Sequence, residues 1–307
     1  MEPDEVQQQL TNQANSRRDR GVILPSQVDD MTAPTGKEMP CSAGGSAASY
    51  VSVAYIYALG RIEARFPRLD VEKEFAQVTS RTENNGKTDQ QVFQEVLSKP
   101  ENRYLVRQMC WILSLQGMET YLLQPRNPMD YDLLVGALRP EPEPGDIDLV
   151  VGVLGPIAPP DLCNGLMVPM VAFDQIYSFT RDALIQAIPR PEKAAEEKYR
   201  PAAEEVFDRI MLMMDNAGAE DEHRAMNYTM MRYPAIFTKA AEQFERDFSL
   251  TGIDTRPSPL SVTRKIIEVI FSYTHRQTDF VEKFYVRVDV TEEFPFLVTK
   301  LSPYFDR

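Results

Sequence analysis

Residues 261–290 read SVTRKIIEVIFSYTHRQTDFVEKFYVRVDV and predict the pair of strands around which the fold is organised. In the second arm, Phe284 to Val290, apolar and polar side chains alternate, as in a strand with one buried and one solvated face. The first arm, Ile266 to Tyr273, is apolar on both faces and favours a central strand covered by helices. A hairpin alone is marginally stable, so we expect further strands and helices upstream.

Strands are also predicted upstream of this hairpin. Residues 50–62, 118–123 and 146–154 carry apolar side chains at strand spacing. Residues 101–115 have the spacing of an interior helix, and residues 155–173 contain too much Pro and Gly for regular structure. Surface and core helices are predicted at 69–79, 88–97, 128–138, 180–188, 192–216, 220–232 and 234–248. The sequence therefore predicts an α+β fold, in which a mixed β-sheet with a long C-terminal hairpin is covered by helices and accompanied by a helical subdomain at 189–250.

Composition limits the class of protein. Residues 1–45 lack an apolar period and are predicted to be a flexible N-terminal arm, followed by one domain at 46–307. The net charge of −13 disfavours nucleic-acid binding, which depends on Lys and Arg contacts to phosphates. No apolar run is long enough to span a membrane, and no secretory signal precedes the domain. Together with the few cysteines, these features predict a cytoplasmic protein without membrane contact.

Catalytic motifs are scarce. The sequence has no nucleophile elbow and no phosphate-binding glycine loop. Its two histidines, His223 and His275, stand in polar segments typical of solvated side chains. We interpret Asp146 and Asp148 as solvated carboxylates beside a loop. The sequence therefore predicts that the protein is not an enzyme.

Three cysteines come from different parts of the chain: Cys41, Cys110 and Cys163. Their spacing matches no zinc-finger pattern. From the residues alone, two interpretations stay open. The thiols meet at a metal ion, or they are buried separately as small apolar side chains.

Six blocks of sequence carry a family resemblance: RIEARFP (61–67), VEKEF (71–75), ENRYLVRQMCWIL (101–113), GPIAPPDLCNGLMVPMVAFDQIYSF (155–179), DEHRAMNY (221–228) and VRVDVTEEFPFLVTKLSPYFDR (286–307). Together they resemble the C-terminal domain of unknown function of PatG-type cyanobactin maturation proteins, over nearly all of residues 41–307. The Asp, His and Ser pattern of the family's subtilisin-like macrocyclase part does not occur, so protease activity does not carry over. The chain is similar to stand-alone members in clusters for ribosomally made, post-translationally modified peptides, including crocagin-type ones.

The resemblance implies a non-catalytic accessory protein, which binds a precursor peptide and presents it to the modifying enzymes of the same pathway. One alternative is a metal-assisted enzyme acting on the same peptide. Another is a scaffold that recruits the modifying enzymes and ignores the peptide. Shortage of bases and nucleophiles favours the binding protein.

The resemblance also implies one structural zinc held by Cys41, Cys110 and Cys163. Members of the family usually have a further cysteine three residues before the first of these, where this chain has Glu38. We therefore expect Glu38 or water as the fourth ligand. A site closed by thiolates is structural, because a catalytic zinc keeps one position open for water.

A flexible peptide is well bound when its backbone adds a strand to an open sheet edge. The second arm of the hairpin is the predicted edge, and its solvated face offers Lys283, Tyr285 and Arg287 to acidic or aromatic peptide groups. The alternative is that these three residues form an ordinary solvated face.

Overall fold

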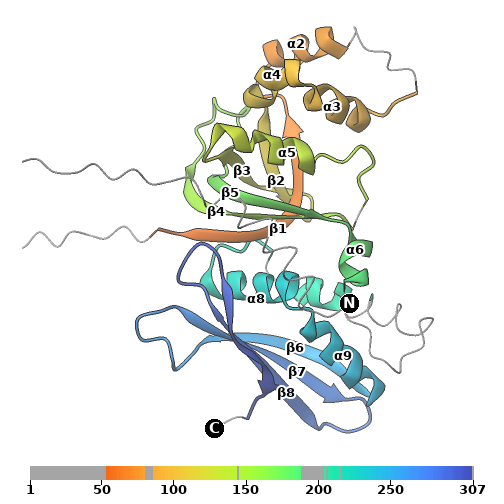
Figure 1. The fold of residues 1–307 in the computed structure, drawn as a ribbon, viewed down its shortest axis with the longest axis vertical. Helices are drawn as coiled ribbons and strands as arrows, with labels where there is room; N and C mark the ends of the chain where they lie inside the picture. The colour runs from red at the N-terminus through yellow and green to blue at the C-terminus, as the bar shows by residue number, and fades with distance from the viewer. Residues whose placement is uncertain are drawn as a thin grey trace, which may run out of the picture. The chain divides into compact units, whose positions relative to one another are not determined.

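The computed structural model describes residues 53–79, 86–143, 145–187, 204, 207–213 and 216–305. All of them fall in one compact unit, and the predicted arm at 1–45 lies outside the described residues. The fold is α+β, as the sequence predicts (Figure 1). Its strands, however, form a barrel and a separate four-stranded sheet instead of one mixed sheet. Within the described ranges, no helix is both long and apolar enough to span a membrane.

The N-terminal strands close into a five-stranded barrel with the order β1-β2-β3-β5-β4. Strands β3 and β5 are parallel, and the other neighbouring pairs are antiparallel. Closure leaves these strands without a free edge. The bounds are β1 Tyr55–Arg65, β2 Cys110–Leu115, β3 Met118–Pro125, β4 Ile147–Ile157 and β5 Pro169–Phe179.

Short helices cover the barrel on the side away from the C-terminal sheet (Figure 1). Helices α2 (Leu69–Thr79), α3 (Asp89–Ser98) and α4 (Arg103–Gln108) lie between β1 and β2, and α5 (Tyr131–Ala137) lies between β3 and β4. Helix α3 begins with a capping box, in which Thr88 and Gln91 each accept a hydrogen bond from the other's backbone N–H. The barrel interior is filled by side chains that include Ile56, Trp111, Leu113, Val150 and Phe173.

Two predictions in this half of the chain are wrong. The helix predicted over 101–115 ends at Gln108, and residues 110–115 form strand β2. All six side chains of β2 are buried. Its sequence therefore shows no alternation of apolar and polar residues, and periodicity cannot distinguish a buried strand from a buried helix. The loop predicted over 155–173 is also shorter, because β4 continues to Ile157 and β5 starts at Pro169.

The C-terminal strands form an antiparallel sheet in the order β6-β7-β8-β9. Strands β7 (Ile266–His275) and β8 (Val281–Asp289) are the predicted hairpin, and β7 is central as expected. Strands β6 (Phe248–Pro257) and β9 (Phe296–Pro303) flank this pair and were not predicted. Both contain residues that obscure the strand pattern, such as Gly252 in β6 and the run of exposed apolar side chains in β9.

Helices α6 (Arg181–Gln186), α8 (Asp221–Arg232) and α9 (Ala235–Glu245) agree with the predicted helices. Helix α8 packs between strand β1 and the sheet, and α9 packs against β6 (Figure 1). Met230 of α8 and Phe237 of α9 lie in the same apolar core as Val269 of β7. The described residues of the predicted helical subdomain thus share their core with the sheet.

Strand β1 belongs to two cores at once. Tyr57 and Leu59 face α8 and the C-terminal sheet, whereas Ile56 and Ala58 face the barrel interior. The backbone N–H groups of Tyr57 and Leu59 donate to the carbonyls of Gly218 and Asn216, each at 2.9 Å. The segment that leads into α8 is therefore hydrogen-bonded along β1.

We predict that Gly218→Ala destabilises the protein. Gly218 has a φ of +58°, and an added Cβ would lie 2.1 Å from the carbonyl oxygen of Tyr57. The free energy of unfolding, measured in urea, should fall by more than about 2 kcal/mol from backbone strain and steric clash together. Gly117→Ala is the matched control, because Gly117 has a φ of +82° but open space around its Cβ position. Equal losses in the two variants would show that residues 216–218 do not pack on β1.

Candidate functional site

The predicted peptide-binding strand is not a sheet edge. Strand β8 pairs with β7 on one side and with β9 on the other. The edge prediction is wrong because residues 296–303 form a further strand beside the hairpin. The predicted face is right, since Lys283, Tyr285 and Arg287 point away from the apolar core that contains Val286 and Val288. We call this side of the sheet, away from α8 and α9, the outer face.

A row of charges crosses the outer face from β6 to β8. Glu268 of β7 is opposite Arg256 in one register and Arg287 in the other. Its carboxylate accepts hydrogen bonds from Nε of Arg256 at 2.8 Å and Nε of Arg287 at 3.0 Å. Burial alone would raise the pKa of Glu268, but these two hydrogen bonds outweigh it and hold the pKa below its usual value. Glu268 therefore stays ionised at neutral pH and fixes both guanidinium groups.

Aromatic rings lie beside these cations. The rings of Tyr285 and Tyr304 meet edge to face, with their centroids 5.7 Å apart. The guanidinium of Arg287 lies 4.9 Å from the Tyr285 ring, and that of Arg256 lies 4.8 Å from the Tyr304 ring. The amino group of Lys283 is 6.0 Å from the Tyr304 ring. Such contacts orient both partners and keep their polar ends towards solvent.

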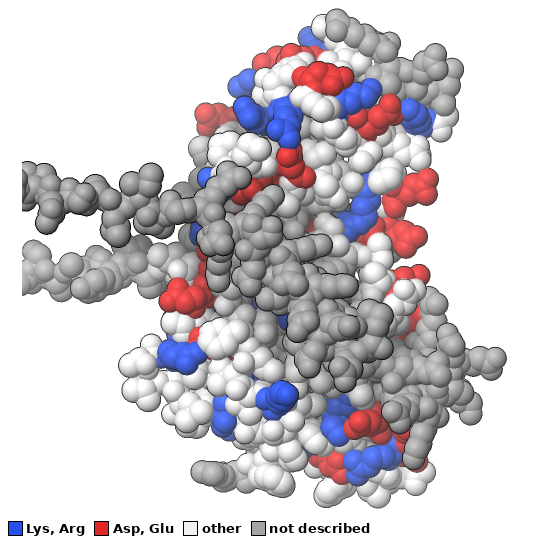
Figure 2. Space-filling model, in the orientation of Figure 1, with Lys and Arg blue, Asp and Glu red and all other residues white. Residues whose placement is uncertain are grey.

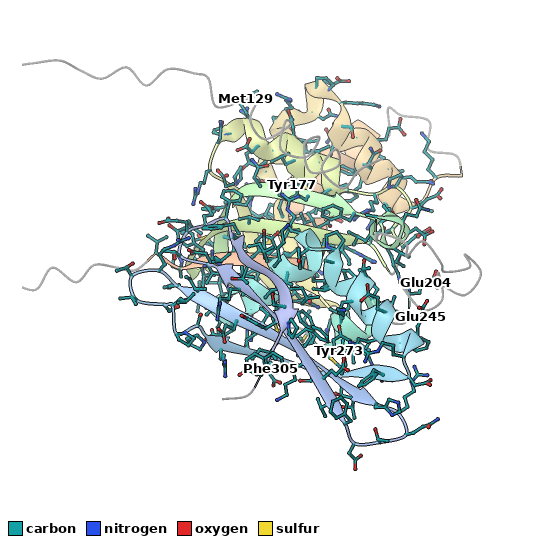
Figure 3. The ribbon with its side chains drawn as sticks, turned by 60° about the horizontal axis from the view of Figure 1, so that its bottom comes forward. Met129, Tyr177, Glu204, Glu245, Tyr273 and Phe305 are labelled. Carbon is teal, nitrogen blue, oxygen red and sulfur yellow. A yellow bond between two sulfur atoms is a disulfide. The ribbon has the colours of Figure 1, made fainter. Side chains whose placement is uncertain are left out.

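Large apolar side chains are exposed around the same sheet. Phe296 is opposite Asp289 in the β8–β9 register. Its large apolar side chain is 47% exposed. In Figure 3, β8 and β9 cross the front of the view and Phe305 lies just beyond the end of β9, where it is 79% exposed. Leu260 and Val262 precede strand β7, whereas Phe280 and Val281 follow its far end, so the exposed side chains lie at both ends of the hairpin. The exposed group comprises Leu260, Val262, Phe280, Val281, Phe294, Phe296, Val298 and Phe305.

Strand β9 is an edge of the sheet, and two of its backbone N–H groups donate to tyrosine hydroxyls. The backbone N–H of Leu297 donates to the hydroxyl of Tyr228 at 3.1 Å, and that of Leu301 donates to the hydroxyl of Tyr233 at 3.0 Å. Both tyrosines belong to α8 or its C-terminal end. Strand addition at β9 would have to break these hydrogen bonds, so the outer face is the more accessible surface.

Two of the three cysteines come together. Cys110, the first residue of β2, forms a disulfide with Cys163 in the β4–β5 loop, with their Cα atoms 5.8 Å apart. Cys41 and Glu38 lie outside the described residues. No group of three or more metal-ligating side chains occurs within the part of the chain that the structure describes. When reduced, Cys110 and Cys163 could supply two of the four ligands of the predicted zinc. The zinc site itself stays a prediction.

The disulfide holds the β4–β5 loop on the outside of the barrel. Cys163 and Ala158 of this loop pack on Ile112 of β2 and Leu122 of β3. Small five-stranded barrels of the OB type bind oligonucleotides or oligosaccharides on their β2–β3 face and with the β4–β5 loop. Here the protein's own loop covers that face. The net charge of −13 also disfavours an oligonucleotide as the ligand of this barrel.

Asp146 and Asp148 lie inside the fold. Asp148 is fully buried and accepts hydrogen bonds from the N–H of Ile62 at 2.8 Å and the hydroxyl of Ser178 at 2.7 Å. Burial raises its pKa in spite of these bonds and of the neighbouring Arg139. The interpretation of Asp146 and Asp148 as solvated is thus wrong, since both are buried and paired with Arg139 inside the fold.

The two histidines lie in different elements. His223 on α8 has Nδ1 3.9 Å from a carboxylate oxygen of Glu220. His275 ends β7, where its ring packs edge to face on Phe248, with the centroids 5.0 Å apart. Neither contact places a nucleophile beside a base.

Comparison with known proteins finds similarity to one type of domain. Residues 193–304 match the protein family described as PatG C-terminal. A solved structure described as "PatG Domain of Unknown Function" aligns over 82% of this chain and 98% of its own, with a TM-score of 0.67 and 20% sequence identity. No curated protein matches the chain. The predicted resemblance to the PatG C-terminal domain is confirmed, and the chain has the fold of that domain.

The zinc prediction can be tested directly. Protein purified under reducing conditions without chelator should contain one zinc per chain, because thiolates are the ligands that structural zinc prefers. Cys110→Ser should remove it, whereas serine at a position outside the site should not. Elemental analysis measures the metal. Metal-free reduced protein with an unchanged fold would contradict the prediction and leave the cysteines as a structural pair.

Proposed function

We propose that the protein is a non-catalytic accessory protein that binds a precursor peptide in the biosynthesis of a ribosomally made, post-translationally modified peptide. The match of residues 193–304 to the PatG C-terminal family supports a place in this kind of pathway. Binding would present the precursor to the modifying enzymes of the pathway. The proposal rests mainly on the outer face of the C-terminal sheet.

The charge of the outer face differs from that of the whole chain. The protein has a net charge of −13, yet Arg256, Lys283 and Arg287 stand together on this face. Two carboxylates share the face: Glu268, which is buried between two guanidinium groups, and the exposed Asp254, two residues before Arg256 in β6. Among these five residues, the three cations outnumber the two carboxylates. A surface with excess positive charge favours acidic partners and raises their association rate.

The chemistry of the face also fits a peptide with aromatic or large apolar side chains. Tyr, Phe and Arg are the residue types enriched at protein interfaces. Tyr285 and Tyr304 offer ring faces, and Phe296 offers an exposed apolar surface at one end of the sheet. Figure 2 shows the lower left of the molecule, where loops at one end of this sheet lie, as mainly white with separate blue patches.

The charged and aromatic side chains of the outer face hold one another in place. Glu268 fixes Arg256 and Arg287, and these two cations lie over Tyr304 and Tyr285. Side chains that are already ordered lose little entropy on binding. A flexible precursor, which must itself become ordered, is therefore best bound by a surface of this kind.

The binding test uses two matched double variants. Lys283→Glu with Phe296→Ser changes the outer face without breaking the Glu268 pairs. Lys73→Glu with Leu69→Ser makes the same changes at exposed positions on α2. Titration calorimetry with the precursor from the same gene cluster should show at least a ~10-fold weaker Kd for the first variant only, because charge and apolar contact are lost together.

Each other outcome supports a different function. Equal affinity of both double variants and the wild type would place the peptide elsewhere. Absence of precursor binding by the wild-type protein would favour a scaffold that recruits only the modifying enzymes. A change in the mass of the precursor after incubation would favour a metal-assisted enzyme, and the proposal of a binding protein would be wrong.

A further inference from the structure

A second surface feature lies on the barrel, far along the chain from the outer face. Helices α3, α4 and α5 line a partly open cavity of about 340 Å³. This volume is at the small end of the range for ligand pockets. Leu97, Val106 and Val135 form apolar walls, one from each helix. The cavity is thus large enough for one or two amino-acid side chains, and its lining combines these apolar residues with polar ones such as Arg103 and Arg107.

The charges at the cavity are unbalanced. Arg103 and Arg107 stand one turn apart on α4, and both line the cavity. Like charges at this spacing repel each other. Asp132 of α5 accepts hydrogen bonds from Arg103 at 2.6 and 2.7 Å and so neutralises that arginine. Within the described residues, Arg107 forms no ion pair with a carboxylate.

Tyr131 supplies a hydrogen-bond donor on the same side. It is the first residue of α5, lines the cavity and interacts electrostatically with Arg107. Burial raises the pKa of Tyr131, although Arg107 opposes this shift. The phenol therefore stays protonated at neutral pH and can donate to an anion.

We propose that this cavity binds a carboxylate attached to an apolar group, with the carboxylate on Arg107 and Tyr131 and the apolar part against Leu97, Val106 and Val135. A planar carboxylate matches the fork of a guanidinium, which makes such pairs strong and directional. The chain terminus of a peptide and an internal acidic side chain both carry this chemistry. The proposal does not depend on peptide binding at the outer face.

Gly136 provides a way to close the cavity without disturbing the fold. It lines the cavity, and no heavy atom lies within 4 Å of a Cβ built on it. Leucine is a better helix former than glycine, so Gly136→Leu should not weaken α5. Its side chain would extend into the open space. This variant therefore removes the volume, whereas Arg107→Gln removes only the charge.

Ligand-observed NMR titration with N-acetylphenylalanine tests the proposal. We expect a Kd of about 1 mM for the acid and at least ~10-fold weaker binding of N-acetylphenylalanine amide, which has no charge. Arg107→Gln should weaken binding of the acid ~10-fold and Gly136→Leu should abolish it. Arg209→Gln, an exposed arginine on another helix, should bind as the wild type does.

A blocked peptide, acetyl-Ala-Glu-Ala-amide, distinguishes the two sources. Stronger binding of this peptide than of N-acetylphenylalanine, with the same loss in Arg107→Gln, assigns the cavity to an internal acidic side chain. Stronger binding of the terminal acid assigns it to a chain end. Equal binding of acid and amide, no saturable binding of any probe, or unchanged binding by Arg107→Gln would overturn the proposal. Unfolding curves establish that each variant is folded.

Discussion

The two halves of the described structure are joined by strand β1, whose central residues have no solvated face. Its even-numbered residues Ile56 and Ala58 fill the barrel, and Tyr57 and Leu59 fill the core shared with α8 and the C-terminal sheet. Burial of a large aliphatic side chain such as Ile56 or Leu59 contributes roughly 1.5–3 kcal/mol relative to exposure. Substitution on either face of β1 therefore affects a core, and the backbone of the strand is held by both.

Polar groups complete this junction because buried backbone atoms need hydrogen-bond partners. The side chain of Asn227 donates to the carbonyl of Tyr57 at 2.7 Å. Arg224, on the same face of α8, is almost fully buried and donates to the carbonyls of Val290 at 2.7 Å and Glu293 at 3.2 Å. One helix thus positions both the barrel strand and the turn that leads into β9. The outer face depends on this turn, since β9 carries Phe296.

The sequence reveals period and local chemistry better than long-range pairing. The alternation after Phe284 predicts correctly which side chains of β8 leave the core. It does not reveal that β9 lies beside β8, because the exposed side chains of β9 include Phe296 and Val298 and so hide the alternation. Strand β2 is misassigned for the opposite reason, since CWILSL is buried on both faces.

The candidate site is predictable to a similar extent. Lys283, Tyr285 and Arg287 follow from the hairpin alone. Arg256 and Tyr304 come from segments for which the sequence predicts no strand, so their contacts with the hairpin could not be predicted. One signal was present: Glu268 interrupts the apolar run IIEVIF, and a charge in a central strand requires partners. The family resemblance predicts that Cys110 and Cys163 lie close together. It does not predict the disulfide between them.

The central claim is that a peptide binds the outer face of the C-terminal sheet. Amide hydrogen exchange, measured with and without the precursor at saturating concentration, tests it most directly because it needs no substitution. The account predicts slower exchange in β8, β9 and the turn at 290–295, with no change in β2 and β3 under the β4–β5 loop. Unchanged exchange throughout residues 281–303, with peptide demonstrably bound, would contradict it.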